Sequence, residues 1–205
     1  MDSKPADNLA RAEFYLCLSR AFLPPSWQGA HQSMAEALPA DLEALGEDLG
    51  YAIAVHLDGY RRAMAALDEL ALLQCYSRLF LSPPAPARIN ACFYLDGAIM
   101  GGSVAELEDW YRRAGVGRSE TFPDLPDHVS LQLEFAGRLF ALAAEGALPE
   151  GMSARAFLGR FVARWLGAFL ADLERAGEAD ANPYLHLARM LSEAVQRDVA
   201  PGETP

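Results

Sequence analysis

Apolar side chains recur at helical spacing through most of the chain. Residues three and four positions apart share one face of a helix, so this pattern predicts amphipathic helices with one buried side. Prolines, glycines and N-capping residues indicate where each helix begins and ends. The predicted helices cover residues 7–23, 26–38, 41–49, 51–81, 103–115, 127–145, 153–177 and 182–199. The range 51–81 is long for one globular helix, so we expect a break at Asp58–Gly59 or at Asp68.

The segment from residue 82 to residue 102 lacks this pattern. It has three prolines within its first five residues and three glycines further on. An irregular connection of this length inside a compact domain is usually functional or poorly ordered. We therefore expect one domain in which a proline-rich connector joins an N-terminal half, at about 7–81, to a C-terminal half, at about 103–199. A hinge of this kind allows halves to be exchanged between chains, so a monomer and a half-swapped dimer both stay open.

Composition decides the fold class. The 205 residues include 37 Ala and 30 Leu but only 12 β-branched residues. Strands are rich in Val, Ile and Thr, whereas Ala and Leu favour helices. The chain is therefore predicted to be all-α, a helical bundle without a β-sheet.

Charge and cysteine content narrow the possible partners and the compartment. The formal net charge is −11, and Lys4 is the only lysine. Such a chain repels nucleic acid and attracts basic peptides. The three cysteines, Cys17, Cys75 and Cys92, are too few and too scattered for a disulfide framework, which favours a reducing compartment. No export signal and no apolar run of about eighteen residues is found, so we expect a cytoplasmic protein without direct membrane insertion.

The histidines give no reason to expect a metal. His31, His56, His128 and His186 lie in none of the spacings typical of metal ligands. The glycine-rich motifs that bind phosphates are also missing from the sequence. The sequence therefore predicts no cofactor.

One polar cluster stands apart, at Asp124, Asp127 and His128, where a loop meets a predicted helix. In a structural interpretation an aspartate caps the helix and His128 is a partly exposed residue of the first turn. In a functional interpretation the two carboxylates accept hydrogen bonds from guanidinium groups of a bound peptide. A third interpretation makes His128 the general base of a small all-α enzyme, although no nucleophile is placed near it.

Several motifs together resemble one known family. Residues 76–83 (YSRLFLSP) are similar to the Tyr-x-x-Leu-Phe-x-Gly-Pro motif of the TorD/DmsD/NarJ family of redox-enzyme maturation chaperones. Residues 93–97 (FYLDG) resemble its Tyr-Leu-Asp-Gly loop, and residues 126–135 (PDHVSLQLEF) match its Pro-Asp-His signature. The resemblance covers about residues 10–195. Two departures are Ser82 in place of the usual glycine and residues 88–92 (RINAC) where Pro-Pro-Tyr-Glu-Ser is common.

The resemblance implies an all-helical, non-enzymatic chaperone of the cytoplasm. Members bind the precursor of a molybdenum-containing oxidoreductase subunit, often at its twin-arginine signal peptide. They hold the precursor until the molybdenum cofactor is inserted and prevent premature export. Such a signal peptide has a basic end and an apolar stretch, so its receptor needs carboxylates beside an apolar surface.

We therefore expect the client to bind where the acidic cluster meets the aromatic part of the connector. The residues expected at this site are Asp124, Pro126, Asp127, His128, Phe93, Tyr94, Leu95, Asp96, Tyr76 and Phe80. The enzyme with His128 as general base, oriented by Asp127 or Asp124, is the first alternative. A ligand-binding helical regulator ranks last, because the chain lacks a basic recognition helix.

Overall fold

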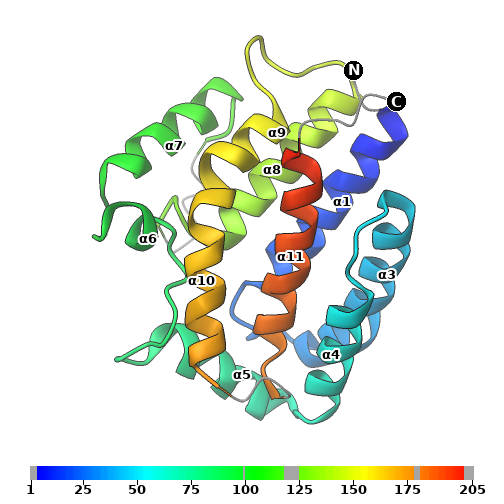
Figure 1. Cartoon of the computed structure of the whole chain (residues 1–205), viewed down its shortest axis with the longest axis vertical. Coiled ribbons are helices and arrows are strands. Elements are labelled where there is room, and N and C mark those ends of the chain that lie inside the picture. The colour runs from blue at the N-terminus through cyan, green and yellow to red at the C-terminus, as the bar shows by residue number, and fades with distance from the viewer. Residues whose placement is uncertain (1–3, 99, 118–124, 178–180, 201–205) are drawn as a thin grey trace.

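The computed structural model describes residues 4–98, 100–117, 125–177 and 181–200 as a bundle of helices (Figure 1). The α-helices are α1 (Pro5–Ala21), α2 (Ala30–Gln32), α3 (Leu38–Leu49), α4 (Ala54–Ala65), α5 (Glu69–Tyr76), α6 (Cys92–Asp96), α7 (Gly102–Arg113), α8 (Val129–Ala144), α9 (Ala154–Phe157), α10 (Ala163–Arg175) and α11 (Pro183–Val199). The π-helical turns η1 (Ser33–Ala37), η2 (Ser77–Leu81) and η3 (Leu158–Val162) continue α2, α5 and α9. Within the described residues, extended pairing is limited to an isolated bridge between Asn90 and His128. The all-α prediction is confirmed.

Helices from the two ends of the chain share one core. Helix α1 packs on α8 more extensively than any other two helices of the described chain pack together, and α4 packs on α11. Figure 1 shows α10 and α11 side by side in the middle, with α3 and α4 to the right and α6 and α7 to the left. A Cβ atom on Gly137 would lie 2.9 Å from the carbonyl oxygen of Ala12, so the absence of a side chain lets α8 approach α1 closely. The two halves on either side of the connector thus interlock.

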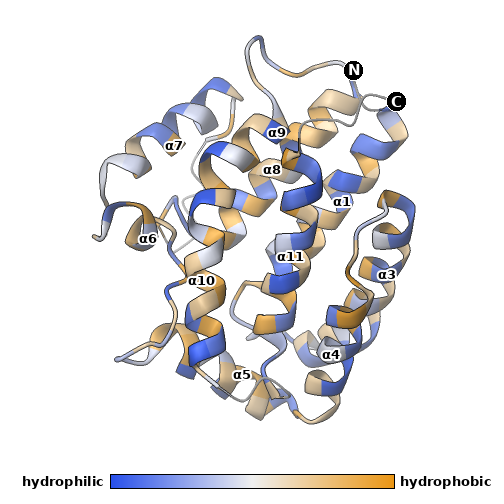
Figure 2. Ribbon diagram, viewed as in Figure 1, coloured by the Kyte–Doolittle hydropathy of each residue, from blue (hydrophilic) through white to orange (hydrophobic). Residues whose placement is uncertain are grey.

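Aromatic rings fill the interior. Apolar residues line the inner helix faces and polar residues the outer ones (Figure 2). The fully buried aromatic side chains are Phe14, Tyr15, Phe22, Tyr60, Tyr76, Phe157, Phe161, Trp165, Phe169 and Tyr184. Burying one side chain of this size stabilises the fold by about 1.5–3 kcal/mol. Four of these aromatic residues, Phe157, Phe161, Trp165 and Phe169, recur at helical spacing, and their burial assigns that helix face to the core.

A buried carboxylate ties the two ends of the chain together. Asp198, near the end of α11, is fully buried. Its Oδ1 accepts a hydrogen bond from Nε of Arg11 at 2.7 Å, and its Oδ2 accepts from the hydroxyls of Tyr15 (2.9 Å) and Tyr51 (2.6 Å). Burial, followed by the charge of Asp198, raises the pKa of both tyrosines. Arg11 thus balances the negative charge of Asp198, and the two neutral tyrosine hydroxyls stabilise the carboxylate by hydrogen bonds.

In the first half one predicted helix break is wrong and another is confirmed. The expected break between 26–38 and 41–49 is wrong, because α2, η1 and α3 form one run from Ala30 to Leu49. Pro39, which lacks an N–H, falls in the first turn of α3, directly after the wider π-helical turn. The break at Asp68 is confirmed: its carboxylate accepts a hydrogen bond from the N–H of Ala71 at 2.8 Å. Gly59 lies inside α4 instead.

The helices predicted over 103–115, 127–145, 153–177 and 182–199 each start at a polar residue of a type that caps helices, and the last two of these residues, but not the first two, are N-caps in the structure. Helix α7 begins at Gly102, and the Ser103 hydroxyl donates to Asp96 and does not cap the helix. Helix α8 begins at Val129, with His128 as its N-cap. The predicted caps Ser153 and Asn182 each accept a hydrogen bond from a backbone N–H of their own helix. The connector is not wholly irregular, because it contains α6.

Candidate functional site

The connector crosses the start of α8 and is fixed to it by backbone hydrogen bonds. The N–H of Ala91 donates to the carbonyl of Asp127 at 3.1 Å, and the N–H of Val129 donates to the carbonyl of Ile89 at 2.9 Å. The structure therefore brings the connector and the Pro126–His128 segment together. The pairing uses residues 89–92 rather than residues 93–96.

Asp127 points into the protein. Asp127 is only 2% exposed, and its Oδ2 accepts a hydrogen bond from the N–H of Cys92 at 2.8 Å. Its Oδ1 accepts from the side-chain amide of Asn90 at 3.4 Å. Burial, followed by a hydrogen bond between the Cys92 thiol and Asp127, raises the pKa of Cys92 to about 11, so this thiol is protonated at neutral pH. Asp127 thus holds the connector and is not the helix cap of the structural interpretation.

His128 is the cap, and it is buried. It is 1% exposed, and its Nδ1 accepts from the N–H of Ser130 at 3.1 Å. The expectation of a partly exposed His128 is therefore wrong. A general base must reach the proton that it removes, and a buried ring with this capping role gives the enzyme alternative no geometric support. Asp124 lies outside the described residues.

A buried amide extends the site toward α10. The side chain of Gln132 donates to the carbonyl of Asp127 at 2.9 Å and accepts from the indole N–H of Trp165 at 3.0 Å. Both partners of this amide are buried. The position of the Asp127 backbone is therefore set from two sides, by the connector and by the core.

The aromatic residues of the connector lie partly at the surface. The Phe93 ring is covered by the guanidinium of Arg88, 4.6 Å from the ring centre. The Tyr94 hydroxyl accepts from the N–H of Arg88 and donates to Asp172 on α10, both at 2.9 Å. Leu95 is half-buried against the core, and the exposed Asp96 accepts from Ser103. These four residues belong to α6, and the hydroxyl of Tyr94 joins α6 to α10.

Tyr76 and Phe80 belong to the core. They are 1% and 6% exposed, and their rings pack on each other with centres 5.0 Å apart. The Tyr76 hydroxyl donates to the carbonyl of Phe22 at 3.3 Å. Neither side chain is positioned to contact a partner on the surface, so both stabilise the fold.

A groove of about 660 Å³ lies between α1, α7 and α8, and the sequence reasoning missed it. It is lined by Leu16, Glu108, Tyr111, Arg112, Val116, Gly117, Pro126, Leu131, Glu134, Phe135, Gly137, Arg138 and Ala141. Its volume falls in the range of ligand-binding cavities, about 300–1,000 Å³. Pro126 joins the groove to the Pro126–His128 segment. The Glu-x-x-x-Arg spacing of its two charged walls, at 108–112 and 134–138, occurs again at 193–197 outside the groove, so the sequence held no specific signal for it.

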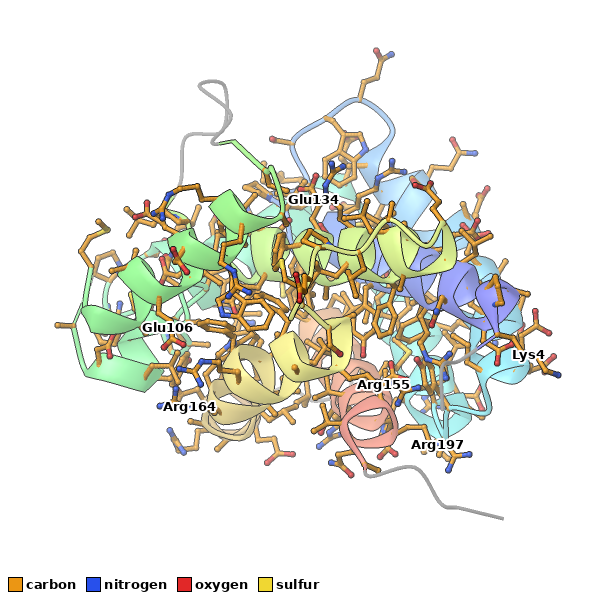
Figure 3. All side chains as sticks on the ribbon, turned by 90° about the horizontal axis from the view of Figure 1, so that it is seen from above. Lys4, Glu106, Glu134, Arg155, Arg164 and Arg197 are labelled. Atoms are coloured by element: carbon orange, nitrogen blue, oxygen red, sulfur yellow. The ribbon has the colours of Figure 1, made fainter. Side chains whose placement is uncertain are left out.

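Tyr111, on the α7 wall, lines the groove. Its hydroxyl donates to the carbonyl of Pro126 at 3.0 Å, and its ring packs edge-on against Phe135 with centres 4.6 Å apart. Burial, followed by the charges of Asp127, Glu134 and Glu108, raises the pKa of Tyr111. Glu134 lies on the side of α8 that faces away from α10 and α11 (Figure 3). Burial and these carboxylates therefore favour the protonated form of the hydroxyl.

The described residues contain neither a metal-binding cluster nor a membrane-spanning helix. Nowhere in them do three or more His, Cys, Asp or Glu side chains gather in a way that could hold a metal ion. None of the helices in the described ranges combines the length and the hydropathy needed to cross a membrane.

Comparison with known proteins is consistent across sequence and structure. The profile of the family "Nitrate reductase delta subunit" matches residues 29–171, more than half of the chain. The "Chaperone protein TorD" of Vibrio vulnificus strain CMCP6 is 27% identical over 194 residues, covering 88% of each chain, and that of strain YJ016 matches equally. A crystal structure described as a redox enzyme maturation protein of Archaeoglobus fulgidus superposes with a TM-score of 0.54 at 21% identity. It covers 89% of this chain and 93% of that one, and shows a shared fold.

Proposed function

This chain belongs to the TorD/DmsD/NarJ family of redox-enzyme maturation chaperones, and on that premise we propose that it binds the precursor of a molybdenum-containing oxidoreductase subunit. The bound part of the precursor is its twin-arginine signal peptide, its catalytic domain, or both. Binding takes place in the cytoplasm, assists insertion of the molybdenum cofactor and prevents premature export. The protein itself catalyses no reaction.

The observation that carries this proposal is the groove beside the Pro126–His128 segment. The family profile covers both α7 and α8, which form two of its walls. Leu16, on the α1 wall, is 36% exposed although it is apolar. An unburied apolar surface in a cavity of this size is typical of a site that is completed by a partner.

The proposal modifies the roles expected of the sequence motif. Asp127 and His128 are buried and act as positioning residues, which hold the connector and the start of α8 in place. The partner contacts the residues that line the groove. Tyr94 and Phe93 at α6 are partly exposed and form a second candidate contact surface beside the connector.

Co-purification tests the proposal. The tagged chaperone is produced together with a molybdoenzyme catalytic subunit from the same genome, once as the full precursor and once without its N-terminal signal segment. We expect the full precursor to co-purify with the wild-type chaperone and to contain more molybdenum cofactor than the same precursor produced without it. A Leu16→Asp variant, which places a charge in the groove, should retain its fold and capture less precursor.

A matched control shows whether precursor capture falls because the groove is altered or because any exposed apolar side chain is lost. Val55 on α4 is 76% exposed and lies outside the groove, so Val55→Asp should capture as much precursor as the wild type. Equal cofactor content with and without the chaperone, for every molybdoenzyme of the genome, would contradict the proposed function.

A further inference from the structure

Helix α7 forms one wall of the groove, yet little of it is buried. Of its twelve residues only Val104 and Leu107 are buried, whereas nine of the sixteen residues of α8 are. We propose that α7 is a lid, which moves away from α8 to admit a partner segment and then closes over that segment. The inference rests on the proposed function, because it describes how the same groove is opened and closed.

The groove is small for a segment of a protein chain. Its volume of about 660 Å³ is that of a site for a drug-sized molecule. Eleven residues in three turns of helix, with a diameter of about 11 Å, occupy about 1,500 Å³. The other two walls, α1 and α8, are the most extensively packed pair of helices in the described chain. The wall that can move to widen the groove is therefore α7.

The backbone on either side of α7 is suited to a hinge. Before the helix, Gly97 has a φ of +71° and Met100 a φ of +60°, and after it Gly115 has a φ of +69°. Residues other than glycine rarely adopt this left-handed conformation, so Met100 is strained. Helix α6, which precedes this hinge, is itself fixed by hydrogen bonds to the start of α8 and to α10. A movement of α7 can therefore begin after α6 and leave the rest of the bundle in place.

Two polar contacts near the surface hold the first half of α7. Asp96 accepts hydrogen bonds from the N–H and the hydroxyl of Ser103. An ion pair joins Glu106 to Arg160 on η3, and both of its side chains are partly exposed. Surface ion pairs contribute little to stability, because water competes for both charges. These contacts can therefore break without unfolding the core.

The second half of α7 rests on aromatic rings. Trp110 packs against Phe157 with ring centres 5.7 Å apart, and Tyr111 packs against Phe135 and donates to the carbonyl of Pro126. Apolar side chains of a bound segment can replace the ring contacts that are lost when α7 moves. A bound segment therefore compensates for the displacement and lets α7 close over it.

Hydrogen exchange of the free protein tests the lid. A detached helix of twelve residues is marginally stable in water, so each opening exposes the amides of α7, and α7 should exchange faster than α8. Arg160→Glu replaces the attraction to Glu106 by repulsion and should speed exchange in α7 about two- to fivefold. A Glu106→Arg, Arg160→Glu double variant restores the pair with its charges reversed and should return to the wild-type rate. Neither residue lines the groove, so these variants leave the binding surface unchanged.

A second ion pair between helices provides the matched control. Arg189 on α11 pairs with Glu174 on α10 at 3.0 Å, away from the groove. Arg189→Glu breaks this pair by the same charge reversal and should leave exchange in α7 at the wild-type rate.

A reversible cross-link tests whether the movement admits the partner. Glu106→Cys and Arg160→Cys are joined by a bismaleimide whose linker contains a reducible disulfide. The probe is the molybdoenzyme precursor used for co-purification. The linked protein should bind it several times more slowly than the wild type, because binding that requires a conformational change is slowed when that change is prevented. Reduction of the linker should restore the wild-type rate.

The possible results separate this inference from the proposed function. Exchange in wild-type α7 as slow as in α8, no acceleration by Arg160→Glu, or equal binding rates of the linked and reduced protein would each overturn the inference. If the precursor nevertheless co-purifies with the wild type, the proposed function stands without the lid. Faster exchange in Arg160→Glu that the double variant reverses, with no precursor bound to any form, would support the movement of α7 and refute the proposed function.

Discussion

The carboxylate of Asp127 accepts a hydrogen bond from the backbone N–H of Cys92, with 2.8 Å between Oδ2 and N. This bond joins the first residue of α6 to the residue that precedes the N-cap of α8, across 35 positions of sequence. Both residues are buried, so the bond is shielded from water. The sequence pattern suggested that Asp127 binds a peptide ligand. In the structure its carboxylate binds the backbone of the protein itself.

Replacing Asp127 should therefore change stability more than affinity. Loss of the carboxylate leaves the buried N–H of Cys92 without its acceptor, which costs about 1–3 kcal/mol. In Asp127→Ala the melting temperature should fall by about 2–4 °C for each kcal/mol, as measured by circular dichroism. The affinity of the folded variant for the precursor should stay close to that of the wild type. Asp109→Asn, at an exposed position of α7, serves as the control.

The opposite pattern would restore a direct role for this carboxylate. An unchanged melting temperature together with a tenfold loss of affinity would mean that Asp127 contacts the client. The hypothesis that client peptide binds where the acidic cluster meets residues 93–96 would then hold in its original form.

Two glycines in helix interiors should respond to alanine with opposite signs. At Gly137 a Cβ atom would lie 2.9 Å from a backbone oxygen of α1, so Gly137→Ala should push α8 away from α1 and lower stability by about 1–3 kcal/mol. At Gly167 on α10 a Cβ atom would meet nothing within 4 Å. There alanine should raise stability by about 0.5–1 kcal/mol, because it favours the helix.

Urea unfolding of the two variants measures this difference directly. Both substitutions replace glycine by alanine inside an α-helix, so both variants gain the same stabilisation from helix propensity. Stabilisation by Gly137→Ala would show that the interface between α1 and α8 can accommodate a methyl group, which would contradict the close packing of the two halves.

The sequence predicted the fold class well and the site only in part. Helix content followed from Ala and Leu, and caps such as Asn182 followed from local chemistry, because both depend on neighbouring residues. Asp127 lies beside the connector, whereas Asp124 lies outside the described residues. The orientation of Asp127 was not predictable, since an aspartate before a helix has the same local pattern whether it faces solvent or a backbone N–H 35 positions away. The groove was missed because its walls come from three helices, and only packing reveals which faces stay uncovered.

Alkaline pH should weaken the cluster around Asp198. The pKa of Tyr51 is raised above its ordinary value by burial and by Asp198, so the folded protein keeps a proton that the unfolded chain loses above about pH 10. The contribution of Tyr51 is therefore complete below about pH 10 and declines as the pH rises further. Thermal melts from pH 7 to pH 11 should show this decline in the wild type.

Tyr51→Phe isolates the contribution of this hydroxyl. At pH 7 the variant should be less stable by about 0.5–1.5 kcal/mol, because Asp198 loses one of its donors. Since phenylalanine does not titrate, the difference from the wild type should narrow above pH 10. A difference that stays constant across the pH range would show that Tyr51 makes no pH-dependent contribution.

The hinge expected at residues 82–102 depends on how firmly α6 is attached to α10. Tyr94 makes that attachment, because its hydroxyl accepts from the N–H of Arg88 and donates to Asp172. Tyr94→Phe keeps the ring but removes both bonds, so limited proteolysis should cut the variant within 82–102 several times faster than the wild type. The same variant should form more dimer in size-exclusion chromatography if freeing the connector allows halves to be exchanged between chains. Phe93→Leu, which leaves both bonds in place, is the matched control. Equal cleavage of all three proteins would mean that the extensive packing of α1 on α8, and not the Tyr94 bonds, holds the two halves together, and the connector would then not be a hinge.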